Sequence, residues 1–510
     1  MPDVRPPRAA SGGADTRAPD LGDLPIDDFR AAGHRVVDLM ADYLANVETR
    51  PVLPPIEPGT IRPLFPAHPP ATAEPVDTIL DDYVRLVEPN ATHWQHPGFL
   101  AYFATSASSP GILGEMLTAT LGQNPMLWRT SPIGTELEEV VVDWLRQALG
   151  LPGAFDGLLT DTASTSTLIA IAAARELAGF DVAQRGLTGR DVPAFRVYGS
   201  TETHSSIEKA CMTLGLGRDA LVRVATRDDY SLDPAALQAA IAADEEAGRL
   251  PIAVVATIGT TSSTAIDPVD RIADIAVARR LWLHVDAAYG GAAALIPGMR
   301  DRFRGWERAD SIVTNPHKWF FTPLDASLLL TRRMEVLRDA FSLVPEYLRT
   351  LDRSAPVRDY NEYTPQLGRR FRALKLWILI RAFGIDGLAR RVEAHIELAR
   401  QLAGRIGVEP GFELLAPVPF STVCFRFVPP WAGGPDDPGR ESRLDELNAA
   451  LIDAVNRSGE VFLSHTRLGG RFTIRVAIGN IRTDERHVER AWELIRLEAA
   501  RLEAARLESR

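Results

Sequence analysis

A lysine stands just beyond an apolar, strand-like run that begins at Ser311, within a largely uncharged stretch that continues to Phe320. This setting suggests that Lys318 is buried, and a buried ammonium is costly unless it is paired or gives up its proton. A lysine with a lowered pKa is suited to Schiff-base chemistry with a carbonyl group. The alternative is an ordinary lysine at a strand end with its amine in solvent.

A second apolar run, Leu281–Val285, also ends in one charged residue, Asp286. In open α/β sheets, ligands bind at the carboxyl ends of the strands, which is where both charges would lie. A lysine in imine linkage and a carboxylate on the pyridinium nitrogen are the two protein groups that pyridoxal 5′-phosphate (PLP) needs. The two residues together indicate a PLP site.

The segments Asn315–Trp319 and His284–Ala288, read as Asn-Pro-His-Lys-Trp and His-Val-Asp-Ala-Ala, closely resemble the group II PLP-dependent amino-acid decarboxylases. The likeness is strongest to the aromatic-L-amino-acid (DOPA/tryptophan) decarboxylases and extends from about Phe29 to about Ile495. It implies an α/β protein with the PLP-dependent transferase fold (aspartate aminotransferase-like, fold type I) and a mainly parallel central sheet. Lys318 would then carry the cofactor and Asp286 would keep the ring nitrogen protonated.

A polar turn of small residues, Gly157–Thr167, leads into an apolar helix at 168–177. Free backbone N–H groups and hydroxyls at such a helix start form an anion site, although ordinary Ser/Thr capping explains the turn equally well. The resemblance places Ala163 and Ser164 at the cofactor phosphate. Asp161 departs from the glycine that many relatives carry there.

His204 follows the short strand at 195–198, and a lone histidine usually has only a structural role. In the resembled family the matching histidine stacks on the pyridine ring, which makes His204 a predicted catalytic and cofactor-binding residue. Thr261, at the end of the strand at 251–257, is placed near the cofactor by the same likeness. Ala288, Asn315 and His317 complete the predicted cofactor-binding set.

The aromatic segment from His96 to Thr105 contains three predicted substrate-binding residues: Tyr102, Phe103 and Thr105. The resemblance places them beside the substrate across a dimer interface, whereas core packing alone would also explain the two aromatic residues. Met126 and Gly368 are the other predicted pocket residues. The glycine leaves room for a bulky indole, and the flexible Met126 can reshape the pocket.

Tyr347 is the predicted proton donor to the substrate Cα. The resemblance implies that it lies in a loop that closes over the site and excludes water and oxygen. Relatives with other residues at the positions of His204 or Tyr347 turn to oxidative deamination and release an aldehyde. The presence of both residues favours simple decarboxylation to an amine.

The chain has 510 residues, of which 45% are hydrophobic and 24% charged, so it is long enough for two or more packed domains. Its formal net charge of −11 argues against nucleic acid or an anionic membrane as a partner.

The two cysteines of the chain, Cys211 and Cys424, are too few for a disulfide framework. With no secretion signal and no long apolar run, we expect a cytoplasmic protein. We predict no metal site.

Five segments are expected: a disordered tail (1–25), an N-terminal dimer-wrapping segment (26–100), a large PLP-binding domain (101–377), a small C-terminal α+β domain (378–497) and a polar helical tail (498–510). A helix is predicted from Asp27 to about Val47, and a helix-free, proline-rich connection from Pro51 to Pro75. The strand at 251–257, the helix at 269–280 and the strand at 281–285 form a βαβ unit.

The expected activity is PLP-dependent decarboxylation of an aromatic L-amino acid by a homodimer. Tryptophan, phenylalanine, tyrosine and DOPA all fit, with tryptophan slightly favoured. An aromatic aldehyde synthase and a glutamate-type decarboxylase are alternatives within the same fold, although Trp319 resembles the aromatic branch more than the glutamate branch. An aminotransferase and a non-catalytic scaffold are less well supported, since a scaffold needs none of Lys318, Asp286, His204 and Tyr347.

Overall fold

The computed structural model describes residues 22–343, 357–434 and 436–508. It contains two compact units, of which the first comprises the chain up to Thr49 with Ile56–Ala91, and the second comprises Arg50–Pro55 with the chain from Thr92 onward. The described residues include only 22–25 of the predicted disordered tail (1–25), and they do not include Tyr347. The division into five segments stays a prediction.

The first unit is helical. Its elements are α1 (Ile26–Asn46), α2 (Val76–Asp82) and short turns at Val47–Thr49, Arg62–Leu64, Tyr83–Val87 and Glu88–Asn90. Arg35 of α1 donates hydrogen bonds to Asp77, at 2.7 Å, and to Asp81 of α2. The helix predicted from Asp27 is confirmed. The connection predicted to be helix-free contains one 3-10 turn, where Pro63 occupies an early position that needs no N–H donor.

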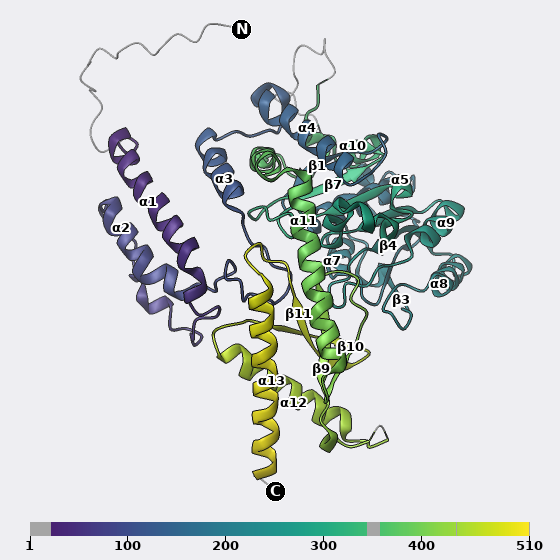
Figure 1. The fold of residues 1–510 in the computed structure, drawn as a ribbon. Helices are drawn as coiled ribbons and strands as arrows, with labels where there is room; N and C mark the ends of the chain where they lie inside the picture. The colour runs from purple at the N-terminus through teal and green to yellow at the C-terminus, as the bar shows by residue number, and fades with distance from the viewer. Residues whose placement is uncertain (1–21, 344–356, 435, 509–510) are drawn as a thin grey trace, which may run out of the picture. The chain divides into compact units, whose positions relative to one another are not determined.

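The second unit is built around a seven-stranded sheet with the order β1-β7-β6-β5-β4-β2-β3 (Figure 1). Only β7 runs antiparallel to its neighbours, so the sheet is mainly parallel, as predicted. The strands are β1 (Asp156–Thr160), β2 (Phe195–Ser200), β3 (Leu221–Val224), β4 (Leu250–Thr257), β5 (Trp282–Asp286), β6 (Ser311–Thr314) and β7 (Ser327–Thr331).

Helices alternate with these strands along the chain. They are α3 (Ser109–Leu121), α4 (Pro132–Ala148), α5 (Ala163–Leu177), α6 (Val182–Arg185), α7 (Ser206–Thr213), α8 (Pro234–Glu246), α9 (Val269–Arg279) and α10 (Met334–Phe341). The unit β4–α9–β5 confirms the predicted βαβ crossover. Strand β4 is buried from Ile252 onward and β5 along its whole length, so both strands are nearly continuous apolar runs rather than alternating ones.

A four-stranded antiparallel sheet forms the second layer of this unit, in the order β10-β11-β9-β8. Its strands are β8 (Phe412–Leu414), β9 (Thr422–Phe427), β10 (Ser464–Leu468) and β11 (Arg471–Ala477), and it packs with α12 (Arg440–Arg457) and α13 (Glu485–Glu508). The long helix α11 (Arg372–Val408) connects the two sheets (Figure 1) and is interrupted at Gly384, whose φ is +64°. No helix in the described ranges has the length and apolarity needed to cross a membrane.

Candidate active site

A cavity of about 190 Å³ lies at the carboxyl ends of the parallel strands. It is lined by the ends of β4 and β5, the start of α5 and the turn after β6. The lining residues are Phe103, Thr162, Ala163, Ser164, His204, Thr257, Gly259, Thr261, Asp286, Ala288, Tyr289, Asn315, His317 and Lys318. The structure thus brings together all nine predicted cofactor-binding residues and Phe103.

Lys318 is one of only three lysines in the chain. Lys209 is exposed on α7, and Lys375 is fully buried with its Nζ bonded to Glu115 and to the carbonyl of Pro323, each at 3.0 Å. The Nζ of Lys318 instead lies in the cavity wall, 5.2 Å from the centroid of the Phe103 ring. Burial lowers its pKa, an effect that the charge of Asp286 opposes and that of Arg475 reinforces. Lys318 is therefore the amine best prepared to attack a carbonyl carbon.

Asp286 is the last residue of β5 and is 6% exposed. It stands beside Thr257 of β4 and Val313 of β6 in the sheet register, and its Oδ1 accepts the amide hydrogen of Ala288 at 3.0 Å. The side chain is thus fixed at the cavity floor. A carboxylate held there can keep a pyridine nitrogen protonated.

The two cavity histidines are held as hydrogen-bond donors at Nε2. Nδ1 of His204 accepts the amide hydrogen of Ser206 at 3.1 Å, and Nδ1 of His317 accepts that of Ala326 at 3.0 Å. Desolvation lowers the pKa of His204, although its ring is open to the cavity, and lowers the pKa of His317 to about 4. Each neutral ring therefore carries its proton on the remaining nitrogen.

The start of α5 also lines the cavity. Its N-cap residue, Thr162, makes no side-chain capping bond, which leaves the first-turn amides at Ala163 and Ser164 to face the cavity. Such amides, at the positive end of a helix, suit a phosphate group. Asp161 does not line the cavity, because its carboxylate binds the amide of Thr162 at 2.6 Å and the side chain of Gln366 at 3.4 Å.

The chemistry of the residues that line the cavity fits PLP. The buried Oγ1 of Thr257 and Oδ1 of Asn315 have no hydrogen-bond partner among the described residues, although both residues border the cavity. Gly259 has a φ of +92°, and a Cβ there would approach the amide nitrogen of Gly290 to 3.1 Å, so the wall comes close only because this residue is glycine. The cavity therefore combines an amine, a carboxylate, a helix start suited to a phosphate group, and buried polar atoms without a described partner.

Four lining residues were not predicted: Thr162, Thr257, Gly259 and Tyr289. Thr257 and Gly259 had a usable signal, since a hydroxyl and a glycine follow the apolar run of β4 at the edge where Asp286 was expected. Tyr289 directly follows the predicted residue Ala288, and its ring stacks on Phe103 with the two centroids 3.8 Å apart.

Four predicted substrate-binding residues do not line this cavity. Tyr102 is 55% exposed, Thr105 and Met126 are half-buried and Gly368 is exposed. The expectation for Tyr102 and Thr105 involved a second subunit, so their role stays a prediction, as do the roles of Met126 and Gly368. Tyr347 lies outside the described residues.

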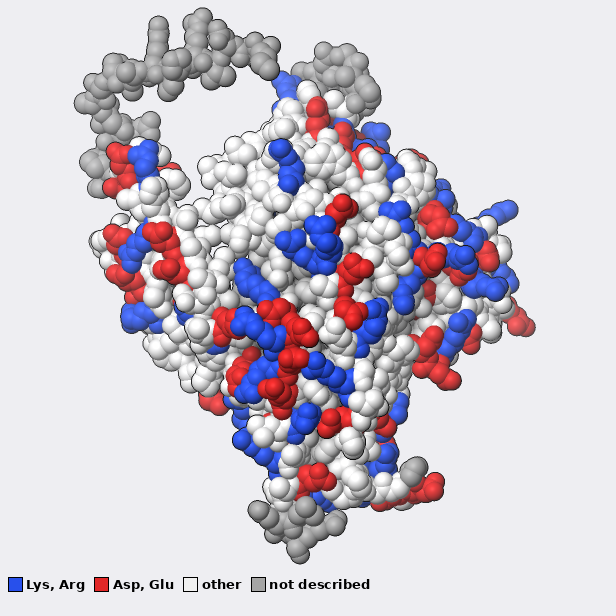
Figure 2. Space-filling model, viewed as in Figure 1, with Lys and Arg blue, Asp and Glu red and all other residues white. Residues whose placement is uncertain are grey.

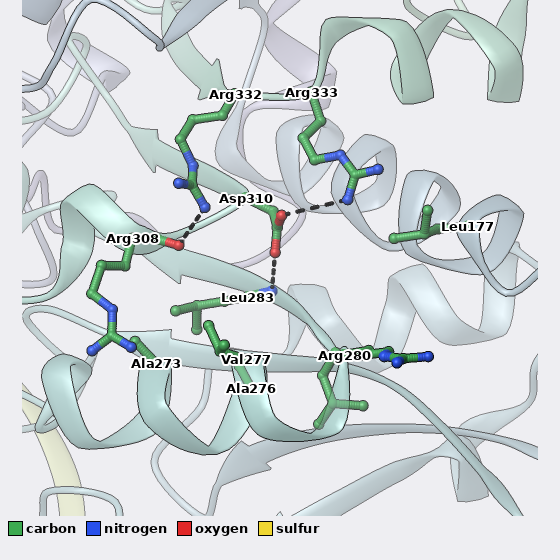
Figure 3. A pocket seen from close by; sticks show the side chains of 11 residues that line it. Leu177, Ala273, Ala276, Val277, Arg280, Leu283, Arg308, Asp310, Arg332 and Arg333 are labelled. Atoms are coloured by element: carbon green, nitrogen blue, oxygen red, sulfur yellow. Dashed lines mark hydrogen bonds and ion pairs between the residues drawn. The ribbon is translucent and has the colours of Figure 1, made fainter.

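A larger cavity, of about 400 Å³, lies near the amino ends of β5 and β6 (Figure 3). Most of the arginines that line it interact with backbone or side-chain groups at this end of the strands. Arg332 donates to the carbonyls of Ala309 and Arg308, at 2.8 and 2.6 Å, and Arg333 lies 3.9 Å from the carboxylate of Asp310. Because this cavity has no lysine in its lining and lies at the other end of the strands, it is not the candidate for carbonyl chemistry.

The sheet, the lysine beyond one strand, the carboxylate at the end of the next and the helix start facing them define a PLP-dependent enzyme. Comparison with known proteins narrows this class. Residues 58–428 match the family described as the pyridoxal-dependent decarboxylase conserved domain. The chain belongs to this family, with PLP as its cofactor and the PLP-dependent transferase fold (fold type I) as its architecture.

Individual relatives cover nearly the whole chain. It is 40% identical to phenylacetaldehyde synthase of Arabidopsis thaliana, over 94% of this chain and 97% of the relative. It is 39% identical to tryptophan decarboxylase 2 of Oryza sativa subsp. japonica, over 94% and 96%. The crystal structure of Oryza sativa TDC with PLP and tryptamine superposes with a TM-score of 0.90 at 35% identity, covering 96% of this chain and 100% of that one.

Proposed function

We propose that this protein decarboxylates an aromatic L-amino acid to the corresponding arylalkylamine and CO₂. The observation that carries the proposal is the convergence of Lys318, Asp286 and His204 on one cavity in a chain that is similar to a tryptophan decarboxylase over almost its full length. Tryptophan is the favoured substrate, and phenylalanine, tyrosine and DOPA are the other members of the substrate class.

Each residue of the cavity has a separate role in the proposed reaction. Bound PLP supplies an electron sink for the carbon that loses its carboxylate. Lys318 would hold the carbonyl carbon of PLP, since its lowered pKa makes the free amine available for that bond. Asp286 would keep the ring nitrogen protonated, and His204 would contact the ring. The backbone amides of Ala163 and Ser164 would bind the phosphate.

The alternative activity is that of an aromatic aldehyde synthase, which decarboxylates and then oxidatively deaminates its substrate. It is supported by the 40% identity to a phenylacetaldehyde synthase. The combination of His204 with Tyr347 favours the amine product, because the tyrosine would protonate Cα before oxygen reacts there. A glutamate-type decarboxylase is the third candidate.

We also propose that the active form is a cytoplasmic homodimer. Three leucines one helical turn apart on α3, Leu113, Leu117 and Leu121, are 55%, 52% and 53% exposed. Figure 2 shows a mostly uncharged surface over this helix. A second copy of the chain would bury this stripe and would bring Tyr102 and Thr105 beside the substrate of its partner.

The test is a product assay on PLP-loaded protein with tryptophan, phenylalanine, tyrosine, DOPA and glutamate in parallel, which follows CO₂, amine, aldehyde and peroxide together. Stoichiometric CO₂ and amine from an aromatic substrate is the expected result. CO₂ with aldehyde and peroxide would establish the synthase instead. CO₂ from glutamate alone would overturn the assignment to aromatic substrates.

A further inference from the structure

Arg475 is a buried cation of β11 that the proposed chemistry does not use. It is 3% exposed, and its described hydrogen bonds all go to uncharged acceptors: the carbonyls of Tyr102 and Ser262, at 2.5 and 3.0 Å, and the hydroxyl of Ser464, at 3.5 Å. Its buried Nη2 has no hydrogen-bond partner among the described residues. An unpaired guanidinium inside a protein is costly, so its burial requires a compensating role.

Arg426, on the neighbouring strand β9, shows the ordinary solution for a buried arginine in the same sheet. It is 2% exposed and is paired with two carboxylates, Glu413 and Glu441, the second at 2.6 Å. Arg475 is about equally buried but has no carboxylate partner among the described residues. Its contacts lie on the active-site side of the sheet. The lack of a counter-charge at Arg475 therefore indicates that the role of this arginine lies at the cavity.

The first contact of Arg475 is with the turn that carries Phe103 into the cavity wall. Tyr102 has a φ of +50°, a left-handed conformation that is unfavourable for a non-glycine residue. Both of its backbone groups are held by the small sheet, the N–H by Ser464 Oγ at 3.1 Å and the carbonyl by Arg475. The guanidinium also lies 4.5 Å from the centroid of the Phe103 ring, within cation–π range.

The second contact is with the loop after β4. Arg475 Nε donates to the carbonyl of Ser262, and Ser262 follows Thr261, which lines the cavity. Two further bonds reach the same residue from the small sheet: Cys424 Sγ donates to its carbonyl at 3.3 Å, and Thr466 Oγ1 bonds its hydroxyl at 2.9 Å. One planar guanidinium thus joins two cavity walls that are about 160 residues apart in sequence.

We propose that Arg475 is a positioning residue that sets the separation between the Phe103 wall and the Thr261 wall of the cofactor cavity. It touches neither the cofactor nor the reacting carbon in this role. Its effect on the reaction arises from the strained Tyr102 turn, which relaxes when its carbonyl is released and then withdraws Phe103 from its stack on Tyr289. Its charge also contributes to the lowered pKa of Lys318.

The test compares Arg475→Met with Arg426→Met, the matched buried arginine of the same sheet. Amide hydrogen exchange is measured on the full chain with and without PLP, and kcat and KM are measured on the loaded enzyme. We expect about tenfold faster exchange in peptides spanning residues 101–104 and 260–265 of Arg475→Met, and no change there in Arg426→Met. We expect kcat to fall about tenfold or more while KM changes less than about threefold.

Other outcomes would overturn the proposal. A rise in KM alone with unchanged exchange would mean that Arg475 binds substrate directly, and uniformly faster exchange throughout β9–β11 would mean that it only stabilises the small sheet. If Arg475→Met does not fold, the same measurements are made on Arg475→Lys, which keeps the positive charge but loses the forked guanidinium group. The kinetic arm rests on the proposed function, whereas the exchange arm does not, so a wild type inactive on aromatic amino acids would leave the exchange result decisive for Arg475.

Discussion

Glu138 of α4 and Arg369, three residues before α11, form an ion pair at 2.6 Å with side chains 1% and 2% exposed. The carboxylate also accepts the amide hydrogen of Leu159 in β1, and the guanidinium donates to the carbonyl of the same residue at 2.8 Å. The pair thus ties α4 and the residues before α11 to the strand that precedes the turn proposed to bind the cofactor phosphate.

Replacing Glu138 with glutamine should lower the free energy of unfolding by about 3 kcal/mol or more, because it leaves the charge of Arg369 buried without a counter-charge. Urea unfolding followed by circular dichroism measures the loss. The control is Glu139→Gln at the adjacent position, where the side chain is 42% exposed and 3.7 Å from Arg358. That change should cost at most about 1 kcal/mol, and equal losses in both variants would contradict the expectation.

Lys318→Ala should lower turnover about 10³-fold or more, since no other residue can take its role as the amine in the cavity. Borohydride treatment of the loaded wild type, followed by peptide mass spectrometry, should find the pyridoxyl group on Lys318. The chain offers only Lys209 and Lys375 as other side-chain sites. Lys209→Ala, on the exposed face of α7, is the control and should retain wild-type turnover. A pyridoxyl group on Lys209 or Lys375 would remove Lys318 from the mechanism.

Tyr347→Phe should divert product from amine to aldehyde, peroxide and ammonia, with one O₂ consumed per aldehyde. The expected cause is loss of the phenolic proton that would reach Cα. An oxygen electrode and an amine assay run on the same sample measure the partition. Tyr363→Phe serves as a tyrosine control outside the cavity lining. Unchanged amine output in Tyr347→Phe would remove this residue from the mechanism.

His395 of α11 should make the protein less stable in acid. It is 4% exposed, its Nδ1 accepts the indole N–H of Trp319 at 3.0 Å, and burial lowers its pKa from 6.5 to about 4. The unfolded chain binds the proton first as pH falls, so the stability present above about pH 6.5 is lost as pH drops through about 4.

Glutamine at position 395 does not titrate and can still accept the indole hydrogen bond. Between about pH 7 and about pH 4.5, the wild type should therefore lose about 2 kcal/mol more unfolding free energy than His395→Gln. Urea unfolding at the two pH values gives the comparison. Equal losses would mean that His395 does not contribute to the acid sensitivity.

Leu117→Glu on α3 should weaken self-association about tenfold or more, because it would bury a charge in the proposed contact between two copies. Sedimentation velocity at several concentrations measures the monomer fraction. Val277→Glu is the matched control, since Val277 is 66% exposed on α9 and lies outside the leucine stripe. A wild type that sediments as a monomer would refute the homodimer itself.

The candidate site could be predicted from the sequence where a charged residue follows an apolar strand. Lys318 and Asp286 each follow an apolar run, so sheet topology brings them to one edge. Arg475 was missed, although it is the lone charge within the apolar part of β11, because sequence does not show which side of a small sheet faces a cavity. The roles of Tyr102 and Thr105 stay predictions because they involve a second subunit, and those of Met126 and Gly368 stay predictions because neither residue lines the cavity of the single chain.

The course of α11 has a mechanical consequence. Leu376, Leu379 and Leu388 of this helix belong to the core of the large sheet, whereas Leu402 and Ile406 belong to the core of the small sheet. The interruption at Gly384 lies within the first set, so the passage from one core to the other occurs along an unbroken helical rod. The stretch of α11 between Leu388 and Leu402 therefore contains no flexible joint, and a rotation of the small sheet would carry this stretch of helix with it.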